Sequence, residues 1–379
     1  MNSPITHHPS PITRPRSVLI IVTRRIGDVL LATPLMRSVK RAWPDTALDA
    51  LVFEGTQGVI AANPDLRSVL TVPERPGRLA HLAFLVQLAR RYDIALSTLH
   101  GDRPTLYAFL AGRWRAGLVN NTRKESWKQA LLNRWAPFDN SNTHTVLMNL
   151  ALAGLTGIEP RREVTVSWSA ADTGQVDALL GSAGAPPIAV LHPYPKFNYK
   201  MWHRAGWIEV AGSLAARGHR IVLSGGADAA EIAYVADLAR AMPADAINLA
   251  GKLSLGEAGC LLARAAVFLG PDTAVTHMAA ALGVPTVALY GPTDPVKWGP
   301  WPRAHSADTN PWRRIGSQRV GNVVLLQGTG ACVPCHLEGC ERRIGSYSDC
   351  LIGLPATRVI DAIRDVTDSP ARGRAGYQE

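Results

Sequence analysis

The chain has 379 residues, of which 47% are hydrophobic and 18% charged, a composition typical of a folded protein. Because this length exceeds what one ordinary core organises, we expect two domains. The formal net charge of +10 favours an anionic partner, such as nucleic acid, an acidic membrane surface or a phosphorylated glycolipid.

Neither the chain ends nor the apolar runs suggest a membrane-embedded protein. Residues 1–16 are polar and proline-rich without the pattern of a secretory signal, so they predict a disordered tail. The longest apolar stretch, residues 79–89, is interrupted by His81 and Gln87 and is shorter than the roughly 18 residues that span a bilayer. We expect a second disordered tail over residues 366–379 and a cytoplasmic protein.

The first half alternates short β-branched runs with helical patterns. The expected strands are residues 17–22, 47–53, 68–72, 93–99 and 114–119. The expected helices are residues 29–43, a short one through residue 62, 79–92 and 104–110. This alternation predicts a parallel sheet covered on both faces.

The second half repeats the pattern after a linker-like segment, residues 181–187. Its expected strands are residues 188–192, 219–224, 247–250, 267–270 and 286–290. Its expected helices are residues 207–216, 229–242, 255–265 and 273–282. We therefore predict an α/β protein of two doubly wound, Rossmann-like domains, residues 17–180 and 188–365, with ligands bound in a cleft between the carboxyl ends of the two sheets.

Two common nucleotide-binding signatures are missing from the sequence. Neither a G-x-G-x-x-G turn nor a G-x-x-x-x-G-K-[ST] loop occurs. This argues against a dehydrogenase and against a P-loop enzyme, but not against nucleotide binding in general.

The segment after the first expected strand, residues 24–31, carries the first candidate for chemistry. Gly27 permits a tight turn, and Asp28 opens the following helix. The Asp28 carboxylate could cap the helix, or it could serve as a general base that takes the proton from an attacking hydroxyl. The two roles compete, because N–H bonds to a carboxylate lower its basicity. Thr33 and Pro34 offer a second helix start, with Thr33 as its cap.

Two segments of the second half could bind phosphate. Lys200 follows a strand end, where a lysine either meets a diphosphate as a mobile point charge or lies in an exposed loop. Residues 270–277 lead from a strand into a helix, and a helix N-terminus suits a phosphate. Asp272 could instead cap that helix, and His277 could be a core histidine.

Basic residues gather between residues 103 and 134, interleaved with three tryptophans. A solvated basic face is one interpretation, and a binding surface for a phosphorylated acceptor is the other. The basic residues are Arg103, Arg113, Arg115, Arg123, Lys124, Lys128 and Arg134.

Four cysteines near the chain's end form the pattern C-x₂-C-x₄-C-x₉-C. The pattern fits a structural zinc or iron site, disulfides formed after lysis, or cysteines that simply pack. These alternatives stay open, and we assign no metal ligand. The residues are Cys332, Cys335, Cys340 and Cys350, with Cys260 apart from them.

Taken together and in this order, the segments resemble glycosyltransferase family 9, the bacterial ADP-heptose:lipopolysaccharide heptosyltransferases. The resemblance runs from residue 17 to about residue 363. It includes I-G-D-V-L-L-A-T-P in the first half, and H-P, K-x-W, S-G-G, P-D-T-A-x-x-H and A-L-G-V-P in the second. The proline that usually follows K-x-W is His203 here.

The resemblance implies a GT-B fold and an inverting, metal-independent transfer that needs no cofactor. It makes Asp28 the catalytic base and Arg25 and Arg103 acceptor-binding residues. Asp228 would accept a ribose hydroxyl, a role that Glu231 could also fill. The implied donor-binding residues are Lys200, Asp228, Asp272, Thr273, Ala274 and His277.

The implied reaction moves a heptose from ADP-heptose to the lipopolysaccharide core, an anionic glycolipid, with peripheral contact at the cytoplasmic face of the inner membrane. One alternative is a protein or capsular acceptor. Another is a non-catalytic nucleotide-sugar binding module, which the retention of Asp28 and Lys200 argues against. Nucleic acid is not expected as a partner, because no nucleic-acid-binding module is recognised.

Overall fold

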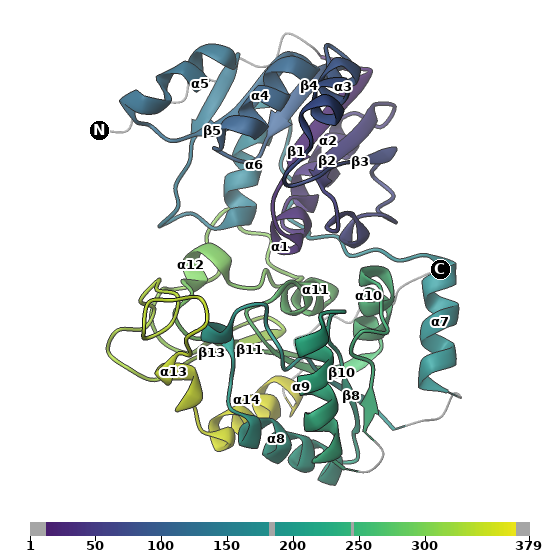
Figure 1. The fold of residues 1–379 in the computed structure, drawn as a ribbon, viewed down its shortest axis with the longest axis vertical. Helices are drawn as coiled ribbons and strands as arrows, with labels where there is room; N and C mark the ends of the chain where they lie inside the picture. Colours follow the sequence, from purple (N-terminus) through teal and green to yellow (C-terminus); the bar gives the residue numbers. More distant parts are fainter. Residues whose placement is uncertain (1–12, 182–185, 244–245, 369–379) are drawn as a thin grey trace. The chain divides into compact units, whose positions relative to one another are not determined.

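The computed structural model describes residues 13–181, 186–243 and 246–368, which form two compact units (Figure 1). The first unit comprises the chain up to residue 167 together with residues 306–309, and the second comprises the remainder. Most of the expected linker at 181–187 lies outside the described residues, as do residues 1–12 and 369–379 of the expected tails.

The division falls before helix α7 (Ala170–Leu180), not after it as the sequence suggested. The helix packs on α10 (Leu255–Ala263) of the second unit. Arg264 Nη1 donates to Asp177 Oδ1 at 2.5 Å, and the Ser254 hydroxyl donates to Asp172 Oδ1 at 3.3 Å. These bonds join residues more than eighty positions apart, which local sequence patterns do not reveal.

The first unit is built on six parallel strands in the order β3-β2-β1-β4-β5-β6. Its strands are β1 (Ser17–Val22), β2 (Ala47–Phe53), β3 (Ser68–Val72), β4 (Tyr92–Ser97), β5 (Gly112–Val119) and β6 (Arg134–Pro137). The first five confirm the expected strands to within two residues at each end, and β6 was not predicted.

Helices cover both faces of this sheet. Helices α3 and α4 supply Leu88, Tyr107 and Ala108 to a core on one face, while α2 and α6 pack together. The helices are α1 (Ile26–Leu30), α2 (Thr33–Ala42), α3 (Arg78–Leu88), α4 (Asp102–Ala111), α5 (Ser126–Leu131) and α6 (Thr145–Thr156), with the 3₁₀ turns η1 (Gln57–Val59) and η2 (Arg123–Glu125). None of the helices in the described residues is both long and apolar enough to cross a bilayer.

The single helix expected over residues 29–43 is two helices. The chain breaks at Leu31 and Ala32, and Ala32 is the N-cap of α2, so the prediction that Thr33 caps it is wrong by one residue. The Thr33 hydroxyl instead donates back to the Leu30 carbonyl at 2.7 Å.

The second unit repeats the strand order of the first. Its sheet runs β12-β13-β11-β10-β7-β8-β9, parallel except for β12 at the edge. The strands are β7 (Ile188–Leu191), β8 (Arg220–Leu223), β9 (Ile247–Asn248), β10 (Ala265–Pro271), β11 (Thr286–Tyr290), β12 (Gln318–Val320) and β13 (Val323–Gln327). If β12 is set aside, both sheets have the Rossmann order, which confirms the predicted fold class.

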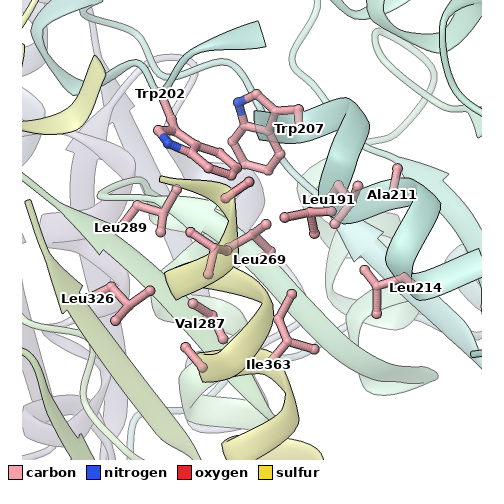
Figure 2. Packing of buried hydrophobic residues seen from close by; sticks show 14 of the residues in the cluster. Leu191, Trp202, Trp207, Ala211, Leu214, Leu269, Val287, Leu289, Leu326 and Ile363 are labelled. Atoms are coloured by element: carbon pink, nitrogen blue, oxygen red, sulfur yellow. The ribbon is translucent and has the colours of Figure 1, made fainter. Parts of the chain in front are cut away.

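A core beneath the helices of the second unit holds Trp202 and Trp207, which pack edge to face with ring centroids 5.2 Å apart (Figure 2). Ile363 of α14 joins this core, and α14 reaches residue 368, so residues 366–368 are helical and not part of a tail. The remaining elements are η3 (Asn198–Lys200), α8 (Arg204–Ala216), α9 (Ala229–Arg240), α11 (Ala274–Leu282), α12 (Pro295–Trp298), α13 (Asp349–Ile352) and α14 (Ala356–Asp368).

A buried ionic network fastens the first sheet. The fully buried Asp49 of β2 accepts hydrogen bonds from Arg67 Nε at 3.0 Å, Ser68 Oγ at 2.8 Å and the Tyr92 hydroxyl at 2.7 Å. Burial alone would raise the pKa of Asp49, but the bonds from Arg67, Tyr92 and Ser68 hold it below its ordinary value. The carboxylate therefore stays charged and ties β2, β3 and β4 together.

We predict that Asp49→Ala lowers the free energy of unfolding by about 3–5 kcal/mol, because it strips the buried network of its acceptor. Chemical denaturation followed by circular dichroism measures this. Asp45→Ala, at an exposed carboxylate just before the same strand, is the control and should change little. Equal stability of the two variants would contradict a stabilising role for the network.

Candidate functional site

The candidate residues of the second unit lie where its strand order reverses, at the carboxyl ends of β7 and β10. His192 follows β7, while Asp272 and Thr273 follow β10, and β7 and β10 are adjacent and parallel. Open α/β sheets bind ligands at this position.

Asp272, Lys200, His277 and Tyr290 form one buried cluster, which we call the Asp272 cluster. Lys200 Nζ forms an ion pair with Asp272 Oδ2 and lies 3.4 Å from the Asp272 carbonyl oxygen. His277 Nε2 lies 3.7 Å from Asp272 Oδ1. The Tyr290 hydroxyl lies 3.3 Å from the same oxygen and 2.7 Å from the Trp298 carbonyl. Lys200 is thus brought to Asp272 and His277 of the segment 270–277, and Tyr290 is added to them.

The charge of this cluster is fixed by its surroundings. Burial would raise the pKa of Asp272, but the charge of Lys200, and then His277, hold it well below the ordinary value. Burial and the Asp272 carboxylate raise the pKa of Tyr290. Asp272 is therefore ionised and Tyr290 neutral, and Lys200 is held in place where the sequence suggested a mobile charge.

Trp202 and His203 explain why Lys200 lies there. Trp202 is buried and its Nε1 donates to the Leu354 carbonyl at 2.8 Å. His203 is the N-cap of α8: its Nδ1 accepts from the Gly206 amide at 3.0 Å, and its Nε2 lies 3.0 Å from the Leu354 carbonyl. A proton on Nε2 satisfies both contacts. His203 therefore anchors the turn that carries Lys200.

The start of α11 is shaped to present backbone amides. Thr273 is its N-cap and accepts from the Thr276 amide at 3.4 Å, so capping falls to Thr273 and not to Asp272. The amides of Ala274 and Val275 open the first turn, where a helix has no acceptors of its own. A Cβ at Gly270 would lie 2.9 Å from the Thr276 hydroxyl of α11, so glycine allows this close approach of strand to helix. His277 is buried, and its Nδ1 has no hydrogen-bond partner within the described part of the chain.

Asp228 and Glu231 lie at the start of α9. Asp228 is exposed and is the N-cap, its Oδ1 accepting from the Ala230 amide at 2.9 Å. Glu231 is half-buried and accepts from the Gly226 amide at 2.6 Å. Burial raises the pKa of Glu231. Both carboxylates line the turn after β8, and one carboxylate oxygen of Asp228 is used in capping the helix.

In the first unit, Asp28 follows β1, which lies at the corresponding reversal of strand order. It is the third residue of α1 and is buried, with Arg24 Nε 3.6 Å from Oδ1. The N-cap of this helix is Arg25, which is exposed, so Asp28 is not the capping residue.

The basic segment 103–134 is only partly a surface. Lys128 is buried, pairing with Asp102 at 2.8 Å and Glu125 at 3.2 Å. Arg103 Nη1 donates to the Glu74 carbonyl at 2.7 Å, and its guanidinium stacks 4.9 Å from the Phe53 ring centroid. The exposed basic residues of the segment are Arg113, Arg123 and Lys124.

The cysteine segment surrounds the buried Cys350. Burial, and then the nearby Cys335, Cys340 and Cys332, raise the pKa of the Cys350 thiol to about 11. All five cysteines are free thiols. Within residues 13–181, 186–243 and 246–368, no three His, Cys, Asp or Glu side chains are arranged to hold a metal ion.

Two Rossmann-like sheets are the architecture of the GT-B fold, which the similar solved heptosyltransferase structures share. Residues 83–312 match the model of glycosyltransferase family 9 (heptosyltransferase). The chain belongs to this family and is a glycosyltransferase.

Individual relatives agree with this assignment. Lipopolysaccharide heptosyltransferase 3 of Escherichia coli is 27% identical over 285 residues, 73% of this chain and 83% of that protein. A family 9 glycosyl transferase from Veillonella parvula superposes with a TM-score of 0.75 at 18% identity, over 94% of this chain and 99% of that one. The E. coli heptosyltransferase WaaC, solved with ADP-2-deoxy-2-fluoro heptose, superposes with a TM-score of 0.61 at 26% identity. The match covers 74% of this chain and 90% of WaaC.

His192 provides a pH test of this region. Its Nδ1 lies 3.1 Å from the Ser224 hydroxyl, and burial lowers the pKa of the imidazole to about 4. The unfolded chain therefore takes up a proton below about pH 6.5 that the folded chain does not accept until about pH 4. The stabilisation is complete above pH 6.5 and is lost as the pH falls through this window.

We predict that, between pH 7 and pH 4, the wild type loses roughly 3 kcal/mol more unfolding free energy than His192→Gln. Denaturation at a series of pH values measures the difference. His336→Gln, at an exposed histidine 3.9 Å from Asp294, is the control and should keep the loss that His192→Gln removes. A difference between wild type and His192→Gln that does not vary with pH would contradict a buried neutral imidazole.

Proposed function

We propose that the protein is an inverting transferase that moves heptose from ADP-heptose to a lipopolysaccharide core acceptor. Membership of family 9 and the relative solved with an ADP-heptose analogue support this donor. The observation that carries the proposal is the Lys200–Asp272 ion pair beside the N-terminus of α11.

In this proposal the donor's diphosphate binds at the start of α11. The Thr273 and Ala274 amides donate to phosphate oxygens, supported by the partial positive charge of the helix N-terminus. Lys200 neutralises the negative charge that builds on the leaving ADP, and Asp272 and His277 hold Lys200 and the strand end in place. Asp228 or Glu231 accepts a hydrogen bond from a ribose hydroxyl.

The reaction is one displacement. The acceptor hydroxyl oxygen bonds to the anomeric carbon while the bond to the ADP oxygen breaks, and ADP leaves with the electron pair through an oxocarbenium-like state. Asp28 takes the hydroxyl proton. A positioned base contributes roughly 10²–10⁴-fold, and stabilisation of the departing charge contributes more.

The acceptor in this proposal is an anionic glycolipid, and the enzyme contacts the inner membrane peripherally from the cytoplasm. The exposed Arg25 and the half-buried Arg103 are the proposed acceptor contacts in the first unit. The basic excess of the chain supports an anionic acceptor.

We predict that Asp28→Asn lowers kcat by about 10²–10⁴-fold while the Kd for ADP stays unchanged, because the base acts only on the acceptor proton. Transfer from ADP-heptose to a truncated core glycolipid gives kcat, and calorimetry gives the Kd. Asp45→Asn, at an exposed aspartate of the same unit, is the control. Parallel loss of turnover and ADP affinity would point to a structural role for Asp28 instead.

We predict that Lys200→Ala weakens ADP binding by about 10- to 100-fold, the effect of a lost hydrogen bond to a charged group. Lys196→Ala, at an exposed lysine of the same loop, should have little effect. Calorimetry with ADP, UDP and GDP measures the affinities and tests the donor class at once.

Removing Lys200 also leaves the buried Asp272 carboxylate unpaired, which destabilises the fold. The double variant Lys200→Ala/Asp272→Asn removes that charge and separates the two effects. It should regain thermal stability but not ADP affinity. Recovery of ADP affinity by the double variant would refute direct contact between Lys200 and the diphosphate.

A further inference from the structure

Helix α3 is apolar on two opposite sides. Its inner side packs Phe84, Leu85 and Leu88 on the core, and the Phe84 ring lies 5.9 Å from that of Tyr107. Its outer side is also apolar, with Leu79 85% exposed, Leu82 59% and Val86 69%. Surface helices normally carry polar residues on the outer side, so these three side chains, the α3 stripe, need an explanation.

The α3 stripe is continuous. Its members are spaced by three and four residues, which places them above one another on one helix face. The neighbouring helices continue the apolar exposure, with Leu106 of α4 at 42% and Trp127 of α5 at 40%. Helix α3 packs beside α4, and α4 beside α5.

Arginines lie at both ends of the stripe, with Glu74 and Asp93 just outside them. Residues 75–92 contain four arginines and no aspartate or glutamate. Arg75 and Arg78 lie at the start of the helix, Arg90 and Arg91 follow its end, and all four are exposed. An apolar helix face bracketed by arginines is complementary to a surface that is anionic outside and apolar beneath.

We infer that α3 docks the enzyme on an anionic phospholipid bilayer, a step that rests on the proposed function and identifies the element that makes its membrane contact. Leu79, Leu82 and Val86 enter the boundary between headgroups and acyl chains. The arginines at both ends bind headgroup phosphates. A helix of 11 residues is about 16 Å long, which is too short to cross a bilayer, and its exposed apolar side chains lie on one face. The helix therefore lies in the plane of the membrane surface.

A second copy of the chain fits this face less well. Stable dimers bury about 800 Å² on each partner, far more than three aliphatic side chains provide. A two-fold antiparallel pairing of α3 would also set Arg75 and Arg78 of one copy against Arg90 and Arg91 of the other. Both area and charge therefore favour lipid over self-association.

Vesicle co-sedimentation of the full chain tests the inference, using phosphatidylcholine vesicles with and without phosphatidylglycerol. We predict that the wild type binds the anionic vesicles, and that added salt weakens the binding. The triple variant Leu79→Gln/Leu82→Gln/Val86→Gln should bind about tenfold or more weakly, because the inserted apolar surface is lost. Ile315→Gln, at an apolar residue 72% exposed in the second unit, is the matched control and should bind as the wild type does.

The outcomes separate this inference from the proposed function. The triple variant should transfer heptose to a de-acylated, water-soluble core acceptor as fast as the wild type, since its changes are outside the site. Undiminished vesicle binding by the triple variant, or no vesicle binding by the wild type, would overturn the role of α3 but not the proposed reaction. If light scattering shows a dimer for the wild type and a monomer for the triple variant, the stripe is a self-association surface instead. Vesicle binding without transfer to any core acceptor would instead refute the proposed function.

Discussion

The ion pair between Lys200 and Asp272 is the contact on which the candidate site depends. Both groups are largely removed from water, so each would be an uncompensated buried charge without the other. The pair links η3, which Trp202 and His203 anchor to the core, with the end of β10, and so fixes two loops from different strands. The ion pair as a unit is close to neutral. In the proposed complex, a diphosphate is therefore bound mainly by hydrogen bonds from the remaining N–H groups of the Lys200 ammonium and from the α11 amides.

Local sequence patterns predict much of the fold. Runs such as SVLIIV and TVALY are short, apolar and β-branched, and such runs predicted ten strands to within two residues. Strands β6, β12 and β13 were not predicted. Arg134–Pro137 of β6 has no such run and is defined by its pairing with β5 at the sheet edge, whereas Val323–Gln327 of β13 carries an apolar run that was not recognised as a strand. Residues 170–180 were included in the first domain, but α7 contacts α10 of the second unit, far along the chain.

The site shows the same limit at the level of single side chains. The residue types and their order predicted the segments that form the site. Which aspartate caps a helix depends on the backbone geometry, which the sequence does not give directly. Asp28 and Asp272 each looked like a cap, yet Arg25 and Thr273 occupy those positions. Asp228, expected to serve the ribose, is the aspartate that does cap. The two aspartates that do not cap a helix are buried, each with a basic side chain nearby.

The number of basic residues in a segment does not show how much charge the segment exposes until the burial of those residues is known. The densest basic segment of the sequence, residues 103–134, loses much of its outward charge, since Lys128 is neutralised inside the unit and Arg115 Nε donates to the Leu131 carbonyl at 2.6 Å. Residues 75–91 carry fewer basic residues, but all four are exposed arginines with no acidic neighbour in the segment and an apolar stripe between them. In the proposed docking, α3 therefore offers an anionic lipid surface both exposed arginines and exposed apolar side chains. For an enzyme whose proposed acceptor is itself a lipid, that arrangement lets one face hold the membrane while the carboxyl ends of the sheets are left to the sugar chemistry.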